Sequence, residues 1–247
     1  MPGFGNLSDA WTGARILARL PVYLRRPWTP DAARAELEGR LRFRESRFLE
    51  AARRLIFGHA GSPYLTLLRR AGCAYGDLAG LVRRDGVESA LSALFRQGVY
   101  LTVEEFKGRR PVVRGETTIS VSPESFRNPR SRVHLVLKSG GSRSGGTPVF
   151  FDLGFIRGCA ADTGLALHVR GGDAWSKATW EVPGAGALFS LFEFGQFGPP
   201  PARWFSQLDP HDGALPSRYR WSGRAFGWGA RLAGVVERLE CRQRRIE

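Results

Sequence analysis

The sequence predicts an α/β protein, with an N-terminal helical region over residues 1–110 and a region of mixed strands and helices over 111–247. Two observations support this prediction. In the first region, apolar residues recur at helical spacing between recognisable helix starts and stops. In the second, β-branched and aromatic runs stand on either side of a stretch rich in glycine and serine, which is typical of strand, loop and strand. The chain is long enough for one or two domains with a core.

The helical pattern begins at Thr29-Pro30-Asp31, which supplies an N-cap, a proline at the first helical position and an acid in the first turn. Apolar residues from Leu37 to Leu55 then continue a helix to Gly58. Further helices are expected over 64–71, 77–82, 87–98, 154–169 and 222–239. Short strands are expected over 111–114 and 117–122, a loop over 123–129, and a buried strand over 189–194.

The formal net charge is +14, and a strongly basic chain suggests nucleic acid as a partner. Only three of the 37 cations are lysines, however, and the arginines are spread along the chain rather than gathered in one segment. Most tryptophans lie in apolar or glycine- and proline-rich surroundings, which favours packing over stacking on bases. We therefore expect no specific nucleic acid partner. An arginine-rich protein that binds polyanions is kept as the alternative function.

The three cysteines, Cys73, Cys159 and Cys241, are widely spaced and form no Cys-x-x-Cys pattern. This spacing argues against a disulfide framework or a zinc site and favours a cytoplasmic protein. We expect Cys73 and Cys159 to be packing residues. No apolar run reaches the length of a membrane span, so no membrane is expected as a partner. The first ten residues lack the basic and apolar parts of a secretory signal.

The segment Lys138–Pro148 is the candidate binding site, because apolar runs over 133–137 and 148–153 enclose it. Its glycines let backbone N–H groups turn inward and form a nest for an anion, while hydroxyl and cationic side chains add donors. The candidate contacts of a polyphosphate are Ser139, Gly140, Gly141, Ser142, Arg143, Ser144, Gly145, Gly146 and Thr147. A solvated hairpin loop without a ligand has the same composition and stays open as the alternative.

The order of these segments resembles that of phenylacetate–CoA ligase-like enzymes of the adenylate-forming superfamily. The resemblance rests on Ser62-Pro-Tyr64, Leu67–Gly72, Asp77-Leu78 and Gly98–Lys107, followed by a loop similar to the family's Ser-Ser-Gly-Thr-Thr-Gly-x-Pro. It implies that residues 111–247 are part of an AMP-binding α/β domain with a mixed sheet. It also implies ATP, Mg²⁺ and coenzyme A as cofactors, and a small carboxylic acid that is adenylated and then converted to a thioester. The loop would hold the β- and γ-phosphates of ATP.

Two departures from the family pattern limit what the resemblance implies. Val149 follows the loop's proline, where many members carry a lysine, and Lys138 stands before the loop instead. The family's later aromatic-Gly-x-Thr-Glu segment, its ribose-binding aspartate and its C-terminal catalytic lysine are not found in the sequence, so the catalytic residues stay unassigned. We expect a truncated first half that is inactive alone, or a split subunit whose partner chain carries the missing half. A non-catalytic remnant is the further alternative.

Other polar groups give weaker indications of a site. The four histidines show no metal-ligand spacing, and His211-Asp212 is expected in a solvated turn. The segment Arg170–Asp173 also predicts a turn.

Overall fold

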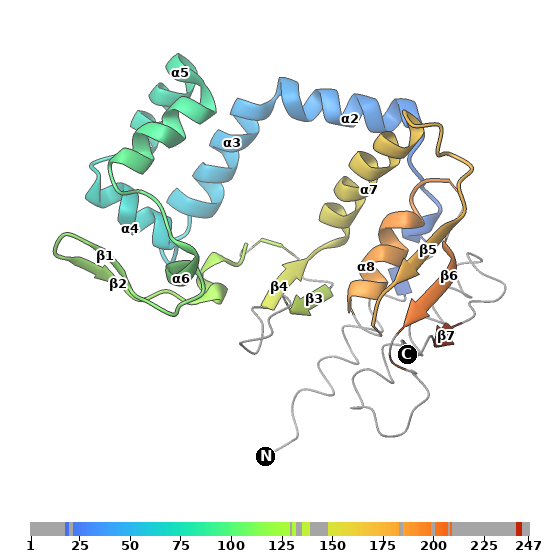
Figure 1. The fold of residues 1–247 in the computed structure, drawn as a ribbon. Coiled ribbons are helices and arrows are strands. Elements are labelled where there is room, and N and C mark those ends of the chain that lie inside the picture. Colours follow the sequence, from blue (N-terminus) through green and yellow to red (C-terminus); the bar gives the residue numbers. More distant parts are fainter. Residues whose placement is uncertain are drawn as a thin grey trace. The chain divides into compact units, whose positions relative to one another are not determined.

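The computed structural model describes residues 18–19, 22–128, 130–131, 135–138, 148–182, 185–198, 201–206, 208 and 241–243. These residues form helices and small sheets, so the mixed α/β class is confirmed (Figure 1). The chain divides by its internal contacts into two compact units. The helical unit comprises the described residues of 38–131 together with Pro148, and the sheet unit comprises those up to Leu37, 135–138 and from Val149 onward. The predicted boundary at residue 110 between a helical region and an enzyme domain stays a prediction.

Helices dominate the first half of the described chain, as predicted. They are α2 (Pro30–Arg42), α3 (Arg44–Ala52), the π-helix η1 (Arg53–Phe57), α4 (Pro63–Arg70), α5 (Tyr75–Arg96) and α6 (Val103–Phe106). The backbone N–H of Ala32 donates to Thr29 Oγ1 at 3.2 Å, so the predicted cap of α2 is present. The single helix expected up to Gly58 is instead interrupted at Phe43 and ends in the π-helix. Gly86, at φ 78°, divides α5 into two parts near the predicted break.

The core of the helical unit is built from apolar side chains of α3, α4 and α5 and the turn after α4. Its buried members are Leu49, Ala52, Leu68, Cys73, Leu78, Ala79, Val82, Val87, Ala90 and Leu94. Burying one large aliphatic side chain stabilises a fold by about 1.5–3 kcal/mol, so this cluster is the main stabilising feature of the unit. The prediction that Cys73 packs in a core is confirmed, and its thiol is free.

Two short strands complete the helical unit. The strands β1 (Val112–Arg114) and β2 (Thr117–Ile119) pair in antiparallel fashion, with Val112 opposite Ile119. Gly115 stands in the connecting turn at φ 59°, a left-handed conformation that favours glycine. Where a loop was predicted after β2, a short 3₁₀-helix, η2 (Pro123–Phe126), is present.

The described part of the sheet unit contains two small sheets, the helices α7 (Leu153–His168) and α8 (Ala185–Phe194), and the first part of α2. The strands β3 (Leu135–Lys138) and β4 (Pro148–Phe151) pair with each other, and α7 follows β4. The strands β5 (Lys177–Trp180), β6 (Pro201–Ser206) and β7 (Cys241–Gln243) form a parallel sheet in that order. The helix α8 connects β5 to β6, because parallel neighbours need a crossover and cannot be joined by a tight turn.

The prediction of a buried strand over 189–194 is wrong, because these residues belong to α8. Their apolar character was recognised, but a short continuous apolar run does not distinguish a strand from a buried helix. The buried residues Ala187, Leu188, Leu191 and Phe192 follow helical spacing. The predicted helix over 222–239 lies outside the described residues. Within the described ranges, no helix has both the length and the apolar character needed to cross a membrane.

Candidate functional site

The predicted phosphate-binding loop stands between the strands β3 and β4. Its residues Ser139, Gly140, Gly141, Ser142, Arg143, Ser144, Gly145, Gly146 and Thr147 lie outside the described residues. The strand β3 ends at Lys138, and β4 begins at Pro148. The two strands are hydrogen-bonded to each other in one sheet. The predicted strands on both sides of the loop are therefore confirmed, and the loop connects two paired strands.

The paired strands β3 and β4 rest on the helices of the sheet unit. The chain passes from β4 directly into α7, whose N-cap Asp152 accepts a hydrogen bond from the backbone N–H of Phe155 at 2.7 Å. The Phe151 ring of β4 lies 5.2 Å from the Phe155 ring of α7 and 5.3 Å from the Phe189 ring of α8, measured between centroids. The strand β3 also contacts α8. Both strands beside the loop are thus fixed to α7 or α8.

Polar groups also meet at the carboxyl ends of β5 and β6, the side on which parallel α/β sheets bind ligands. Trp204 Nε1 donates to the backbone oxygen of Glu181 at 2.8 Å, and Ser206 Oγ donates to that of Leu208 at 2.8 Å. The side chain of Thr179 is buried, and its hydroxyl has no hydrogen-bond partner in the described part of the chain. No pattern in the sequence indicates this group, since a threonine in a strand is ordinarily a packing residue.

Lys177, at the opposite end of β5, is a buried cation. Its Nζ donates to the backbone oxygens of Phe194, at 3.3 Å, and of Phe197, and lies 4.0 Å from the centroid of the Phe197 ring. Burial lowers the pKa of this ammonium to about 8. Because Phe194 is the last residue of α8, Lys177 satisfies carbonyl groups at the end of that helix. These contacts give it a structural role.

The predicted turn over Arg170–Asp173 is confirmed by Gly171 at φ 72°. His168 Nδ1 and Asp173 Oδ2 lie 2.7 Å apart across this turn, and both side chains are partly exposed. Asp173 also borders a small hollow whose other walls include Trp28 and Phe197. With a volume of about 50 Å³ the hollow is too small to enclose a substrate, and the His168–Asp173 contact links the end of α7 to the turn that follows it. The predicted turn at His211-Asp212 lies outside the described residues.

The described residues contain no group of three histidine, cysteine, aspartate or glutamate side chains that could hold a metal ion. No described residue is therefore assigned to Mg²⁺. None is assigned to coenzyme A or to the carboxylic acid.

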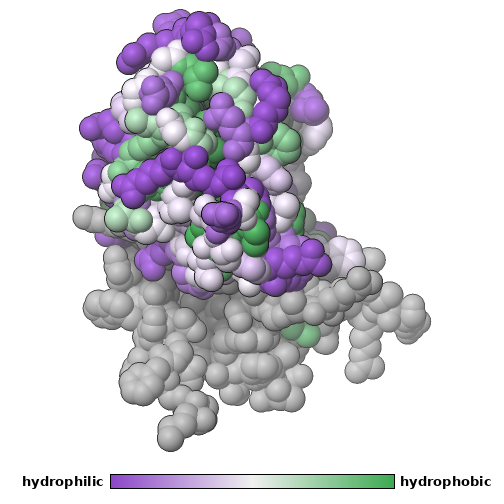
Figure 2. All heavy atoms as spheres, turned by 90° about the vertical axis from the view of Figure 1, so that its left-hand side faces the viewer, coloured by the Kyte–Doolittle hydropathy of each residue, from purple (hydrophilic) through white to green (hydrophobic). Residues whose placement is uncertain are grey.

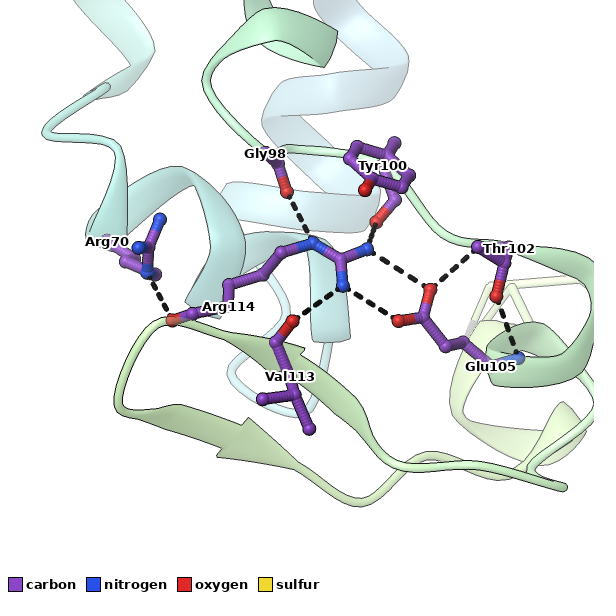
Figure 3. A network of polar contacts seen from close by, with 7 residues as sticks. All are labelled: Arg70, Gly98, Tyr100, Thr102, Glu105, Val113 and Arg114. Carbon is purple, nitrogen blue, oxygen red and sulfur yellow. Dashed lines mark hydrogen bonds and ion pairs between the residues drawn. The ribbon is translucent and has the colours of Figure 1, made fainter.

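The most extensive polar network that the structure describes lies in the helical unit, around Arg114 (Figure 3). Its guanidinium donates to both carboxylate oxygens of Glu105, at 2.7 and 3.1 Å. It also donates to the backbone oxygens of Gly98 at 3.1 Å, Tyr100 at 2.8 Å and Val113 at 2.8 Å. All five N–H donors of the arginine are used. We call these five residues the Arg114 clamp, and because no donor is left for a substrate, its role is structural.

Glu105 is fixed from a second side by the start of α6. The backbone N–H of Thr102 donates to Glu105 Oε2 at 2.7 Å, and the N–H of Glu105 donates to Thr102 Oγ1 at 3.3 Å, which is a capping box. The hydrogen bonds from Arg114, and then those from Thr102, hold the pKa of Glu105 down to about 2. The Thr-x-x-Glu spacing in the sequence predicts the capping box, but nothing in it predicts that Arg114 pairs with Glu105.

No protein-family model, no curated protein and no solved structure matches this chain. The resemblance to phenylacetate–CoA ligase-like enzymes therefore stays a prediction from the sequence.

Proposed function

We propose that this chain carries the phosphate-binding loop of a phenylacetate–CoA ligase-like, adenylate-forming enzyme. The observation that supports this most is the pairing of β3 with β4 at the two ends of the glycine- and serine-rich segment. Paired strands hold the ends of the loop close together, so its backbone N–H groups can converge on one anion. ATP with Mg²⁺, when bound, supplies the adenylyl group that activates a carboxylic acid.

In this proposal the chain's own contribution is to bind and orient phosphates. Gly140, Gly141, Gly145 and Gly146 allow their backbone N–H groups to approach the β- and γ-phosphates closely. Ser142 and Ser144 add hydroxyl donors, and Arg143 balances negative charge. Such fixed donors stabilise the charge that develops as pyrophosphate departs. The fixed seat of β3 and β4 on α7 and α8 supports this orienting role.

Calorimetric titration with Mg–ATP and with pyrophosphate tests the proposal. We expect binding to the wild-type chain and none to a Gly141→Val, Gly145→Val double variant, because valine blocks close approach of the backbone. Gly39→Ala is the control, since a Cβ at that helical glycine meets no atom within 4 Å. Absence of binding to the wild type, or binding that survives the double change, would contradict a phosphate-binding loop at this place.

Catalytic turnover needs more groups than phosphate binding does. The adenine, ribose and lysine motifs that the resemblance calls for are not found in the sequence, and in-line positioning provides much of the rate of such reactions. We therefore expect no carboxylate-dependent pyrophosphate exchange by this chain alone. Exchange with any aryl or fatty acid would show that other residues perform these roles.

A further inference from the structure

Arg70, the last residue of α4, differs from an ordinary exposed arginine because one side of its guanidinium is held. Its Nε donates to the backbone oxygen of Arg114 at 2.8 Å, across 44 positions of the sequence (Figure 3). Arg114 is itself immobilised by the five bonds of its clamp. The hydrogen bond therefore restrains the orientation of the Arg70 guanidinium, whereas the guanidinium of a solvated arginine rotates freely.

The Nη1 and Nη2 groups of Arg70 have no hydrogen-bond or ion-pair partner among the described residues, although the side chain is exposed and charged. Arg114, by contrast, shares its charge with Glu105. The positive charge of Arg70 is thus uncompensated at a defined position. Figure 2, which views the side carrying α4, α5 and the β1–β2 hairpin, shows hydrophilic residues over much of this face, interrupted by smaller hydrophobic areas.

Two glycines leave space around these free donors. A Cβ at Gly115 would lie 3.0 Å from Arg70 Nη2, and a Cβ at Gly98 would lie 3.8 Å from Nη1. Both glycines have left-handed backbone angles, with φ 59° and φ 84°, and they come from different turns. A side chain at Gly115 would therefore shift the Nη2 end of the guanidinium by a few tenths of an ångström. The two turns frame the end of Arg70 that carries both Nη groups.

We propose that Arg70 is an oxyanion-binding site, separate from the glycine-rich loop, that takes a phosphate or carboxylate group through parallel hydrogen bonds from Nη1 and Nη2. An arginine presents two parallel N–H groups in the spacing of two oxygens of such an anion. Because the guanidinium is already oriented by Arg114, less conformational freedom is lost on binding. The site goes beyond the proposed loop function, since it uses residues of the helical unit alone.

The test is an NMR titration of the ¹⁵N-labelled full chain with sodium phosphate and, separately, with sodium acetate. The amide signals of Gly98 and Gly115 report on the site. We expect saturable shifts at roughly millimolar anion, as for one charge-assisted bidentate contact. Saturation by phosphate identifies a phosphate site, and saturation by acetate a carboxylate site. No saturation by either anion overturns the proposal.

Lysine variants distinguish the paired-donor geometry of Arg70 from its positive charge. Arg70→Lys keeps the charge but removes the paired donors, and we expect it to weaken binding about tenfold or more. Arg83→Lys, at an exposed arginine of α5, is the matched control and should change nothing. Equal losses in both variants, or undiminished binding in Arg70→Lys, would show general attraction to a basic surface.

A charge-neutral pair of variants provides a second measurement. Gly115→Ala should weaken binding by displacing Nη2, whereas Gly72→Ala, with a similar φ of 65° and no atom within 4 Å of its Cβ, should not. Repeating the titration in the Gly141→Val, Gly145→Val variant separates this site from the loop. Shifts at Gly98 and Gly115 that persist there support the Arg70 site whatever the fate of the loop, and shifts that vanish there overturn it.

Discussion

The two units of this protein each bury a cation, but only the cation of the helical unit is paired with a carboxylate in the described residues. In the helical unit, Arg114 meets a carboxylate and three carbonyl groups, and its side chain is 11% exposed. In the sheet unit, Lys177 meets carbonyl oxygens and two aromatic rings, with no carboxylate partner in the described residues. The pairing favours the charged forms of Arg114 and Glu105, whereas burial disfavours the charged form of Lys177. A buried cation therefore keeps its charge where a carboxylate matches it, and is shifted toward its neutral form where none does.

Removing the carboxylate of the clamp should have the largest effect. Glu105→Gln leaves Arg114 without its counter-charge, and we expect the helical unit to lose about 3 kcal/mol, the low end for breaking a buried pair. Urea unfolding followed by far-ultraviolet circular dichroism measures this loss. None of the seven tryptophans lies within residues 38–131, so tryptophan fluorescence reports on the rest of the chain. Asp85→Asn, in the exposed Arg84–Asp85 pair, is the control and should cause no measurable loss.

Because of Lys177, the free energy of unfolding of the sheet unit should increase as the pH rises from neutral to alkaline. The pKa of Lys177 in the folded protein, about 8, lies below the ordinary value of 10.5, so between these values the unfolded chain binds more protons. We expect a gain of about 2 kcal/mol from about pH 7.5 to about pH 9.5, measured by tryptophan fluorescence in urea. Burial also raises the pKa of Tyr23, which opposes the gain above this range. A Lys177→Met protein with the same pH dependence would contradict the assignment.

Glu105 should produce a dependence of the same sign at acid pH, with stability falling as the pH falls. Its pKa of about 2 lies below the ordinary 4.5, so its contribution is complete above pH 4.5 and is lost as the pH falls through 2. The Glu105 side chain is only 10% exposed, but a protonated carboxyl keeps part of its hydrogen bonding to Arg114 and Thr102, so we expect a loss of about 1–2 kcal/mol. The signal is the difference in acid unfolding between wild type and Glu105→Gln, followed by circular dichroism. Identical acid profiles for the two proteins would be the contrary result.

The smallest change in stability is expected at Thr179. This residue is a buried polar group of the sheet unit that, like Lys177, lacks a matching partner in the described part of the chain, but it carries no charge. Its buried hydroxyl has no partner among the described residues, so Thr179→Val should stabilise the sheet unit by about 1 kcal/mol or leave it unchanged. Thr179→Ser, which keeps the hydroxyl and removes a methyl group, should destabilise it. A clear loss of stability in the valine variant would mean that the hydroxyl has a partner after all.

Local patterns predicted the fold well where one residue determines the backbone. Thr29 caps α2, Gly72 adopts φ 65° after α4, and Gly86 divides α5. The break at Phe43 could not be predicted, because no glycine or proline stands there. The prediction for residues 189–194 failed because a short apolar run is compatible with a strand or a buried helix. The helix α8 forms here as the crossover between the parallel strands β5 and β6.

The candidate site was predictable only in part, for a similar reason. The paired strands beside the loop follow from apolar runs on both sides of glycines. The partners of Arg114, however, stand up to 16 positions away and are chosen by the tertiary fold. Arg70 has no distinguishing feature among many arginines in the sequence. Only the bond to Arg114, 44 positions away, sets it apart.

The Arg114 clamp also suggests an order of folding. Its bonds to Glu105, Tyr100 and Gly98 span 9, 14 and 16 positions, whereas the bond from Arg70 spans 44. Closing the longer loop costs about 1 kcal/mol more in chain entropy. Residues 98–114 can thus assemble as an early nucleus on which α4 docks later. In kinetic terms, Glu105→Gln should slow refolding, while Arg70→Gln should mainly speed unfolding. The oxyanion site would then exist only in the last state to form, so an anion bound there would slow unfolding and leave refolding unchanged.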